Sequence, residues 1–282
     1  MFFSVLVHKY NISNGFCFIL VCYCLKMDDN TEFILRGNGS DISNDFLEPI
    51  IIPIETHVAK LGVKNFAFYN NIPNIEDGKN NQIKVKLPDS NDYEVFSLDT
   101  GAYELATIAE QLVEWIEITH PQLKNVENNF RLIGNEATSK AEFLFKDDYG
   151  VDFNVENSIC TLLGFEKEQS FHGAGRYIAG EIFKITHVTQ LIFNCNLTES
   201  NYINGRETPF LYNCGIDVPV GYRLSRELTD ISYKNLTTSQ ISHIRVWIVD
   251  QNGAPINLRN DDVVITLSLK LKRRVAEVSF AS

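Results

Sequence analysis

The feature that most constrains the fold is a strict alternation of side chains near the end of the chain. One set of alternate positions is wholly apolar, namely Val263, Ile265, Leu267, Leu269 and Leu271. The intervening set is Val264, Thr266, Ser268, Lys270 and Lys272. Successive side chains of a β-strand point to opposite faces, so the pattern predicts a half-buried strand in an antiparallel sheet.

A second alternating run precedes this strand. Ile244, Val246 and Ile248 alternate with other residues, and the run ends at Asp250-Gln251-Asn252-Gly253. Asn-Gly is a strong hairpin turn signal because both residues tolerate positive φ. We therefore interpret 241–272 as a final hairpin, with 255–262 as a loop or a short extra pairing. The turn and this loop are expected at one end of the fold, where contacts between subunits would form.

Composition and charge narrow the class of protein. The 282 residues are 44% hydrophobic, which is enough for a real core in one large all-β domain or two small ones. The net charge of −11 makes direct nucleic-acid binding unfavourable, because phosphate contacts need a basic surface. One basic cluster, Lys270, Lys272, Arg273 and Arg274, is interpreted as a solvated strand edge and tail.

Cysteine usage indicates a reducing compartment. Three of the six cysteines, Cys17, Cys22 and Cys24, precede the polar part of the chain. The other three, Cys160, Cys195 and Cys214, are an odd number without CxxC spacing. This favours buried free thiols over a disulfide framework or a zinc site.

The N-terminus divides into two parts before the main domain. Residues 1–26 form an apolar leader without a small-x-small cleavage site, which we interpret as upstream read-through with Met27 as the natural start. The alternative is a secretory leader, which would make the sequons at Asn38, Asn196 and Asn235 usable. Residues 27–47 are expected to be a flexible arm, 48–272 a single domain and 273–282 a tail.

Two helices are predicted among many short strands. Apolar residues recur at helical spacing from Leu105 to Ile116, with Pro121 beyond the end. We expect this amphipathic helix to pack on a sheet; the less favoured alternative is a partner-binding helix. A short helix is expected over 157–165, ended by Gly164.

The remaining segments read as strands and turns. Strands are predicted at 48–54, 63–69, 82–87, 93–98, 190–197, 208–214 and 218–224, the first and last of them edge strands because of their prolines. A hairpin is expected over 140–155, with Asp147-Asp148 in its turn, since a calcium loop needs further acidic positions. Residues 171–177 contain GAGR and are expected to be an exposed loop, not a dinucleotide site.

The sum is an all-β fold with minor α content. Short, turn-punctuated strands without βαβ alternation predict a jelly-roll β sandwich of antiparallel strands with one long and one short helix inserted. No catalytic spacing such as GxSxG, HExxH or GxxxxGK[ST] occurs. The six histidines, His8, His57, His120, His172, His187 and His243, are scattered singly. We therefore predict no catalytic, cofactor-binding or metal-binding residues and no enzyme activity.

Six segments, taken together and in order, resemble one family. They are FAFYNNIPNIEDGKNN (66–81), TGAYEL (100–105), NSICTLLGF (157–165), SNYINGRETPFLYN (200–213), VPVGYRL (218–224) and 244–272. The set resembles the minor capsid, or penton, proteins of Polinton/Maverick elements and related adintoviruses and virophages. The resemblance spans about 48–272. It departs from the pattern at Asn260-Asp261-Asp262 and at Cys160, which leaves open a decayed integrated copy.

The resemblance implies a single jelly-roll subunit that forms homopentamers at capsid vertices. Its partners would be other copies of itself and a double jelly-roll major capsid protein, and its location the virion. No small-molecule substrate is implied. The alternative is a secreted or surface carbohydrate- or receptor-binding β sandwich without catalysis. A jelly-roll enzyme of the cupin kind needs clustered histidine and carboxylate ligands, which isolated histidines do not provide.

Overall fold

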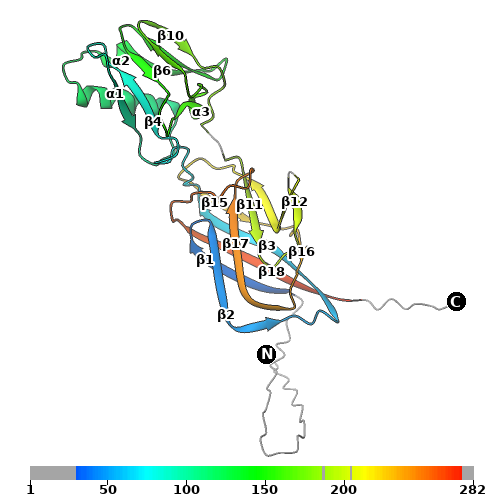
Figure 1. Ribbon diagram of the computed structural model, residues 1–282. Coiled ribbons are helices and arrows are strands. Elements are labelled where there is room, and N and C mark those ends of the chain that lie inside the picture. The colour runs from blue at the N-terminus through cyan, green and yellow to red at the C-terminus, as the bar shows by residue number, and fades with distance from the viewer. Residues whose placement is uncertain (1–29, 186–187, 204, 275–282) are drawn as a thin grey trace, which may run out of the picture.

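The computed structural model describes residues 30–185, 188–203 and 205–274 of the chain. Its described part has two lobes, a β sandwich and an insert that stands at one end of it (Figure 1). The chain leaves the sandwich after β3 (His57–Tyr69) and returns at β11 (Gln190–Cys195). Each lobe has its own cluster of buried apolar side chains. The single domain expected over 48–272 is thus divided between two cores.

The sandwich consists of two antiparallel sheets. Sheet A has the order β1 (Asn30–Asn38), β18 (Asp262–Arg273), β3 and β15 (Arg223–Glu227), with β16 (Lys234–Asn235) also paired to β3. Sheet B has the order β14 (Phe210–Gly215), β11, β17 (Gln240–Val249) and β2 (Asp41–Ile51). Every pairing within these sheets is antiparallel.

The strand order identifies a jelly roll. Along the chain, β1, β2, β3 and β11 alternate between sheets A and B, β14 stays beside β11, and β15, β17 and β18 alternate again. The eight strands β1, β2, β3, β11, β14, β15, β17 and β18 thus form two Greek keys over two facing sheets, which defines the fold. The antiparallel jelly-roll sandwich predicted from the sequence is confirmed.

The alternating strand that closes the chain lies at the centre of sheet A. β18 pairs with β1 on one side and β3 on the other. The five apolar residues of its inner face are at most 9% exposed and pack against side chains from sheet B. Figure 1 shows β18 between β1 and β3 in the lower lobe. The alternation thus predicted the strand and its buried face correctly.

The final hairpin predicted over 241–272 is wrong. β17 lies in sheet B and β18 in sheet A, and the two strands do not pair. The Asn252-Gly253 turn is present, with Gly253 at φ 83°, but it leads into a connection that crosses from one sheet to the other. An alternating pattern indicates which residues face inward, but it does not indicate which strand pairs with them.

The outer face of sheet A is partly covered by another segment. Thr266 and Ser268 point outward yet are only 6% and 4% exposed. The hydroxyl groups of Tyr233 and Ser268 lie 3.1 Å apart, within hydrogen-bond distance. A Cβ on Gly62 would lie 2.4 Å from Ile231 Cγ2, so only glycine fits where this segment crosses β3. The polar face of β18 is therefore covered where it passes Tyr233.

The insert contains two small sheets and three helices among the described residues. One sheet has the order β5 (Tyr93–Ser97), β4 (Gln82–Lys86), β8 (Gly150–Asp152), β9 (Ser170–His172); the other has β10 (Gly175–Ile178), β7 (Lys140–Phe145), β6 (Phe130–Asn135). The helices are α1 (Leu105–Thr119), α2 (Val126–Asn129) and α3 (Cys160–Leu163). Eight aromatic side chains are buried in its core: Phe96, Phe130, Phe143, Phe145, Tyr149, Phe153, Phe165 and Phe171.

The insert contains the two helices and the β4–β5 hairpin that the sequence predicts. α1 buries Leu105, Ile108, Leu112 and Ile116 against the insert core, so the amphipathic helix is confirmed. Gly164 ends α3 at φ 81°, as expected of a glycine at a helix end. The β4–β5 hairpin is also present. In the described ranges no helix has both the length and the apolar content needed to cross a bilayer.

Three other predictions, for residues 140–155, 171–177 and 27–47, are wrong. The hairpin over 140–155 does not form, because β7 pairs with β6 and β10 whereas β8 pairs with β4 and β9. The GAGR segment is not a loop, since β10 begins at Gly175. The flexible arm over 27–47 contains β1 and most of β2, whose buried residues Phe33, Leu35 and Ile42 belong to the jelly-roll core.

Candidate functional site

The interior of the jelly roll is packed with buried apolar side chains. Side chains from the two sheets fill it, with Phe66 and Phe193 in ring contact at 4.8 Å between centroids. Cys195 and Cys214 belong to this core, and burial raises the pKa of each thiol to about 11. Both therefore remain protonated and unreactive at neutral pH. The buried free cysteines predicted from the sequence, Cys160 among them, are confirmed.

No histidine belongs to a catalytic arrangement in the part of the chain that the structure describes. Four have a single polar neighbour each: His57 with Thr56 (2.8 Å), His120 with Glu94 (3.1 Å), His172 with Asp148 (3.5 Å) and His243 with Asp45 (2.7 Å). These pairs lie on separate elements. His8 and His187 lie outside the described residues. Across 30–185, 188–203 and 205–274, no three His, Cys, Asp or Glu side chains converge on a metal position.

The Asp147-Asp148 pair has a structural role. Asp148 Oδ2 accepts a 2.6 Å hydrogen bond from Nζ of Lys86. Lys86 is on β4, the strand that pairs with β8. This ammonium group holds the pKa of Asp148 below its usual range. Asp147 Oδ1 accepts from the backbone N–H of Asp148. The pair therefore stabilises the bend between β7 and β8, and its contacts are not those of a cation site.

A buried carboxylate ties the other sheet of the insert together. Glu142 on β7 is 2% exposed and accepts hydrogen bonds of 2.7 and 2.8 Å from the Arg176 guanidinium on β10. Asn135 Nδ2 on β6 donates a third at 2.9 Å. The bidentate pair lowers the pKa of Glu142 and raises that of Arg176. All its partners belong to the insert, so this is a clamp and not a catalytic acid.

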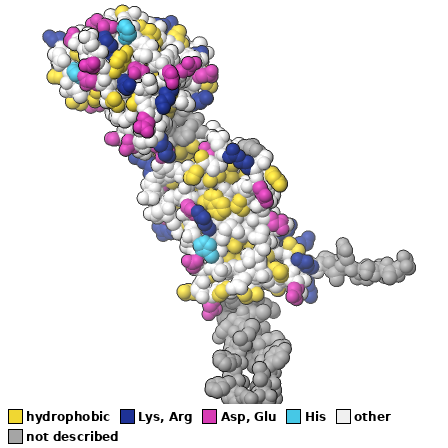
Figure 2. Space-filling view, in the orientation of Figure 1, with side chains coloured by type: hydrophobic (Ala, Val, Ile, Leu, Met, Phe, Trp, Pro, Cys, Tyr) yellow, Lys and Arg dark blue, Asp and Glu magenta, His cyan; other side chains and the backbone are white. Residues whose placement is uncertain are grey.

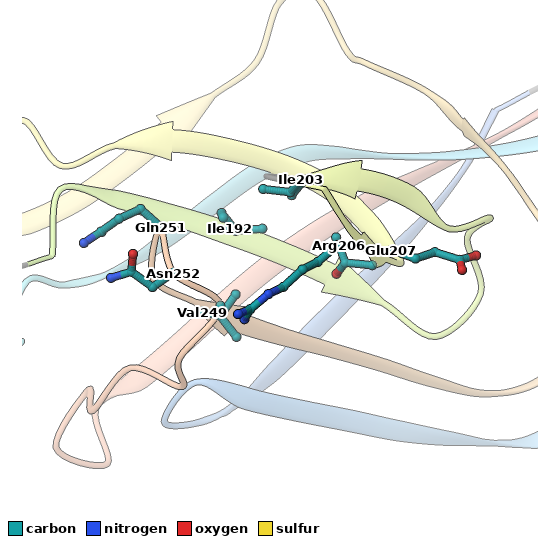
Figure 3. Close-up of a pocket in the computed structure, with 9 residues that line it drawn as sticks. Ile192, Ile203, Arg206, Glu207, Val249, Gln251 and Asn252 are labelled. Atoms are coloured by element: carbon teal, nitrogen blue, oxygen red, sulfur yellow. The ribbon is translucent and has the colours of Figure 1, made fainter.

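One hollow lies on the outer side of sheet B (Figure 3). It has a volume of about 400 Å³ and lies between the β12 (Asn201–Ile203) and β13 (Arg206–Thr208) hairpin and the turn after β17. Its apolar lining comes from Ile192, Ile203 and Val249, and its polar lining includes Arg206, Gln251 and Asn252.

Arg206 is the charged group best placed to meet a ligand there. Figure 3 shows its side chain extended toward Val249, whereas the Glu207 side chain points away. No carboxylate within the described ranges forms an ion pair with Arg206. A guanidinium beside amide groups over an apolar floor can bind a polar ligand, but it provides no nucleophile or base.

A second hollow, of about 700 Å³, lies where the insert meets the jelly roll. Asn74 joins the two connecting segments there. Its Nδ2 donates to the carbonyl oxygens of Tyr103 (2.7 Å) and Ile185 (2.9 Å), and its Oδ1 accepts from the backbone N–H of Tyr103 (2.9 Å). The amide group is thus fully used in holding the junction.

The loop over 255–262 also contributes to this junction. Asn257 Nδ2 donates to Glu76 Oε2 at 3.0 Å, and the Arg259 guanidinium donates to the carbonyl oxygen of Thr100 at 3.2 Å. The expected position at one end of the sandwich is observed, and there Asn257 and Arg259 contact the insert of their own chain.

The outer face of sheet A carries an apolar side chain inside a charged frame. Ile34 on β1 is 68% exposed. On one side of it, Lys64 Nζ lies 2.6 Å from Glu32 Oε1. On the other, the Arg36 guanidinium forms two 2.9 Å hydrogen bonds to Asp262. Protein–protein contacts have an apolar centre and a polar rim, and this face has both on a small scale.

Comparison with solved structures gives a likeness in fold, whereas the sequence comparisons give none. No family model matches this chain, and no curated protein matches its sequence. A crystal structure of selenomethionine-labelled mavirus penton protein superposes with a TM-score of 0.46 and 12% sequence identity. The superposition covers 86% of this chain and 99% of the other.

The hollow and the Ile34 face were not found from the sequence. Arg206 follows the dipeptide Asn204-Gly205 in the sequence. Asn-Gly is a hairpin signal, but it does not indicate the surface on which a hairpin folds. Ile34 lay in a segment expected to be a flexible arm. Its alternation with Phe33 and Leu35, both buried, was the available signal for a strand with one exposed apolar residue.

Proposed function

We propose that this chain is a structural capsid protein of a Polinton-like DNA virus, whose copies assemble as pentamers at capsid vertices. The observation that carries the proposal is a jelly roll whose interior is packed with apolar side chains, so that function must reside on outer surfaces. The resemblance of six ordered segments to penton proteins supports it. The proposed location is the virion, with a double jelly-roll major capsid protein as neighbour and no catalysis.

The Ile34 face is the contact that we assign to this assembly. A ring of five copies needs heterologous contacts, in which one surface of each subunit meets a different surface of the next. Burial of an isoleucine at the centre of such a contact contributes about 1.5–3 kcal/mol. The ion pairs that frame Ile34 would form the polar rim.

Size-exclusion chromatography with light scattering on the full chain tests both statements. The wild-type protein is expected to have the mass of five copies, and Ile34→Asp the mass of one. Ile118→Asp is the matched control, because Ile118 is 70% exposed on α1 and lies far from sheet A. A wild-type monomer would overturn the vertex role. A pentamer that survives Ile34→Asp would overturn only the assigned contact.

The hollow beneath the β12–β13 hairpin favours a second candidate function, a carbohydrate- or receptor-binding sandwich. The Arg206 guanidinium offers donors to carboxylate and hydroxyl groups beside an apolar floor. Binding of an acidic sugar such as a uronate, followed by NMR chemical-shift changes, tests this candidate. The changes should disappear in Arg206→Ala and persist in Arg131→Ala, a change in the insert. Absence of any shift with the wild-type chain would remove it.

A further inference from the structure

The charge of this protein is unevenly distributed along its length. Residues 73–189, which contain the insert, hold twenty Asp and Glu against ten Lys and Arg. The rest of the chain holds sixteen acidic against fifteen basic residues. The insert therefore carries almost the whole net charge of −11. It stands at one end of the jelly roll, so the opposite end is far from this negative charge (Figure 1).

That opposite end, which we call the base, carries a cluster of basic side chains. The base consists of the second half of β2, the connection from β2 to β3, the first residues of β3 and the last residues of β18. Five basic residues lie there: Lys60 on β3, and Lys270, Lys272, Arg273 and Arg274 at the end of β18. The described carboxylates form no ion pair with any of them. The acidic residues at this end are Asp45 and Glu48 on β2, of which Asp45 is paired with His243, and Glu55 in the connection.

Apolar side chains project from the same end. Leu47 is fully exposed, Ile51 is 65% exposed and Ile54 is 46% exposed. Leu47 lies where the β2–β17 register is interrupted, so that residues 46–49 lie outside the ladder at the edge of sheet B. Figure 2 shows hydrophobic side chains at this end of the molecule, with basic and some acidic side chains beside them.

The backbone places the apolar and basic groups side by side. His57 pairs with Arg273 in the β3–β18 ladder, and the Arg274 N–H donates to the carbonyl oxygen of Thr56 at 2.8 Å. The turn between Ile54 and His57 is itself closed by the His57 N–H, which donates to the Pro53 carbonyl oxygen at 2.9 Å. Ile54 and the terminal arginines are therefore held on one ordered surface.

We propose that the base is a binding surface for an anionic lipid bilayer. Basic side chains are attracted to anionic headgroups, and exposed leucine and isoleucine side chains gain by entering the headgroup–acyl boundary. The acidic insert at the far end would be repelled, which orients the molecule with its base on the lipid. Nucleic acid explains the basic groups only, because phosphate contacts give Leu47, Ile51 and Ile54 no apolar partner. This proposal does not rest on the vertex role.

Vesicle co-sedimentation of the full chain tests the proposal. Vesicles of phosphatidylcholine mixed with phosphatidylserine are compared with vesicles of phosphatidylcholine alone. The wild-type protein should bind the anionic vesicles more strongly, and added salt should weaken that preference. Lys272→Gln with Arg273→Gln should lower the binding constant about fivefold for each charge removed. Lys124→Gln with Lys146→Gln is the control, since both residues are exposed on the insert and the net charge changes equally.

The apolar contribution is tested separately. Leu47→Ser with Ile54→Ser should reduce binding to anionic vesicles, whereas Ile118→Ser with Ile182→Ser on the insert should not. All four side chains are at least 46% exposed, so the folded core is unaffected. Equal binding to both vesicle types, or no loss in the base variants, would overturn the proposal. So would binding of duplex DNA by the same basic residues without vesicle binding, or loss of the oligomer in the base variants.

Discussion

Gly62→Ala is the substitution whose cost the structure defines most closely. The added Cβ would lie 2.4 Å from Ile231 Cγ2 and 3.0 Å from the carbonyl oxygen of Ser232. The first atom belongs to a stiff β-branched side chain and the second to backbone, so neither can simply rotate away. Overpacking of this kind costs about 1–3 kcal/mol. We expect a loss of free energy of unfolding in the upper half of that range.

Urea denaturation of the jelly roll measures this loss. Trp247 lies on β17 in the jelly roll and Trp115 on α1 in the insert, so a Trp115→Phe background makes fluorescence report on the jelly roll. Ile231→Ala removes the clashing methyl group. In the double variant, much of the cost of Gly62→Ala should therefore disappear, which gives a coupling energy of about 1 kcal/mol or more.

A second readout distinguishes strain from detachment. If the covering segment lifts off β3 instead of compressing, trypsin should cleave after Lys234 faster in Gly62→Ala than in the wild type. Two results together would refute the reasoning: a loss of stability below about 0.5 kcal/mol, and no increase in cleavage. They would mean that 231–233 does not cross β3 in solution.

The remaining predictions concern the two cores. Leu267→Asp buries an unpaired carboxylate between the sheets and should abolish folding, seen as loss of the denaturation transition; Ile34→Asp on the outer face should retain it. Hydrogen bonds from Arg176 lower the folded-state pKa of Glu142. The stability that this ion pair contributes is therefore present above the unfolded pKa of about 4.3 and is lost as the pH falls through the folded pKa. Glu142→Gln should remove that part of the acid dependence of stability, measured by thermal melts between about pH 3 and 6. Cys195 should not react with a thiol reagent at neutral pH until urea unfolds the jelly roll; rapid reaction in the native protein would contradict its burial.

The sequence predicted well those elements whose determinants are local. α1 follows from the spacing of its apolar residues, and the end of α3 follows from Gly164, because both depend on neighbours within a turn or two. β18 follows from its own alternation. The jelly-roll class also follows, since many short antiparallel strands without βαβ alternation leave few other sandwiches.

Strand partnership was not predictable in the same way. β7 and β8 are separated by four residues, as a hairpin would be, yet the chain passes from one sheet to the other between them. Between β17 and β18 the chain likewise crosses from one sheet to the other, through a longer connection. The choice between a hairpin and a crossing depends on which distant strand buries the apolar face, and single-strand patterns contain no information on it. The candidate surfaces depend on these partnerships, so the sequence could not locate them either.

The position of β18 has a consequence for the synthesis of this protein. Phe33 and Val63 both pair with Leu267, which means that the two earliest strands of sheet A meet only through the last strand of the chain. On the ribosome the insert has its own core and can fold as soon as it emerges, whereas sheet A must wait until β18 has been synthesised. Until then the inner faces of β1 and β3 lack their central partner. We expect C-terminal truncations that remove β18 to leave a folded insert attached to an aggregating remainder.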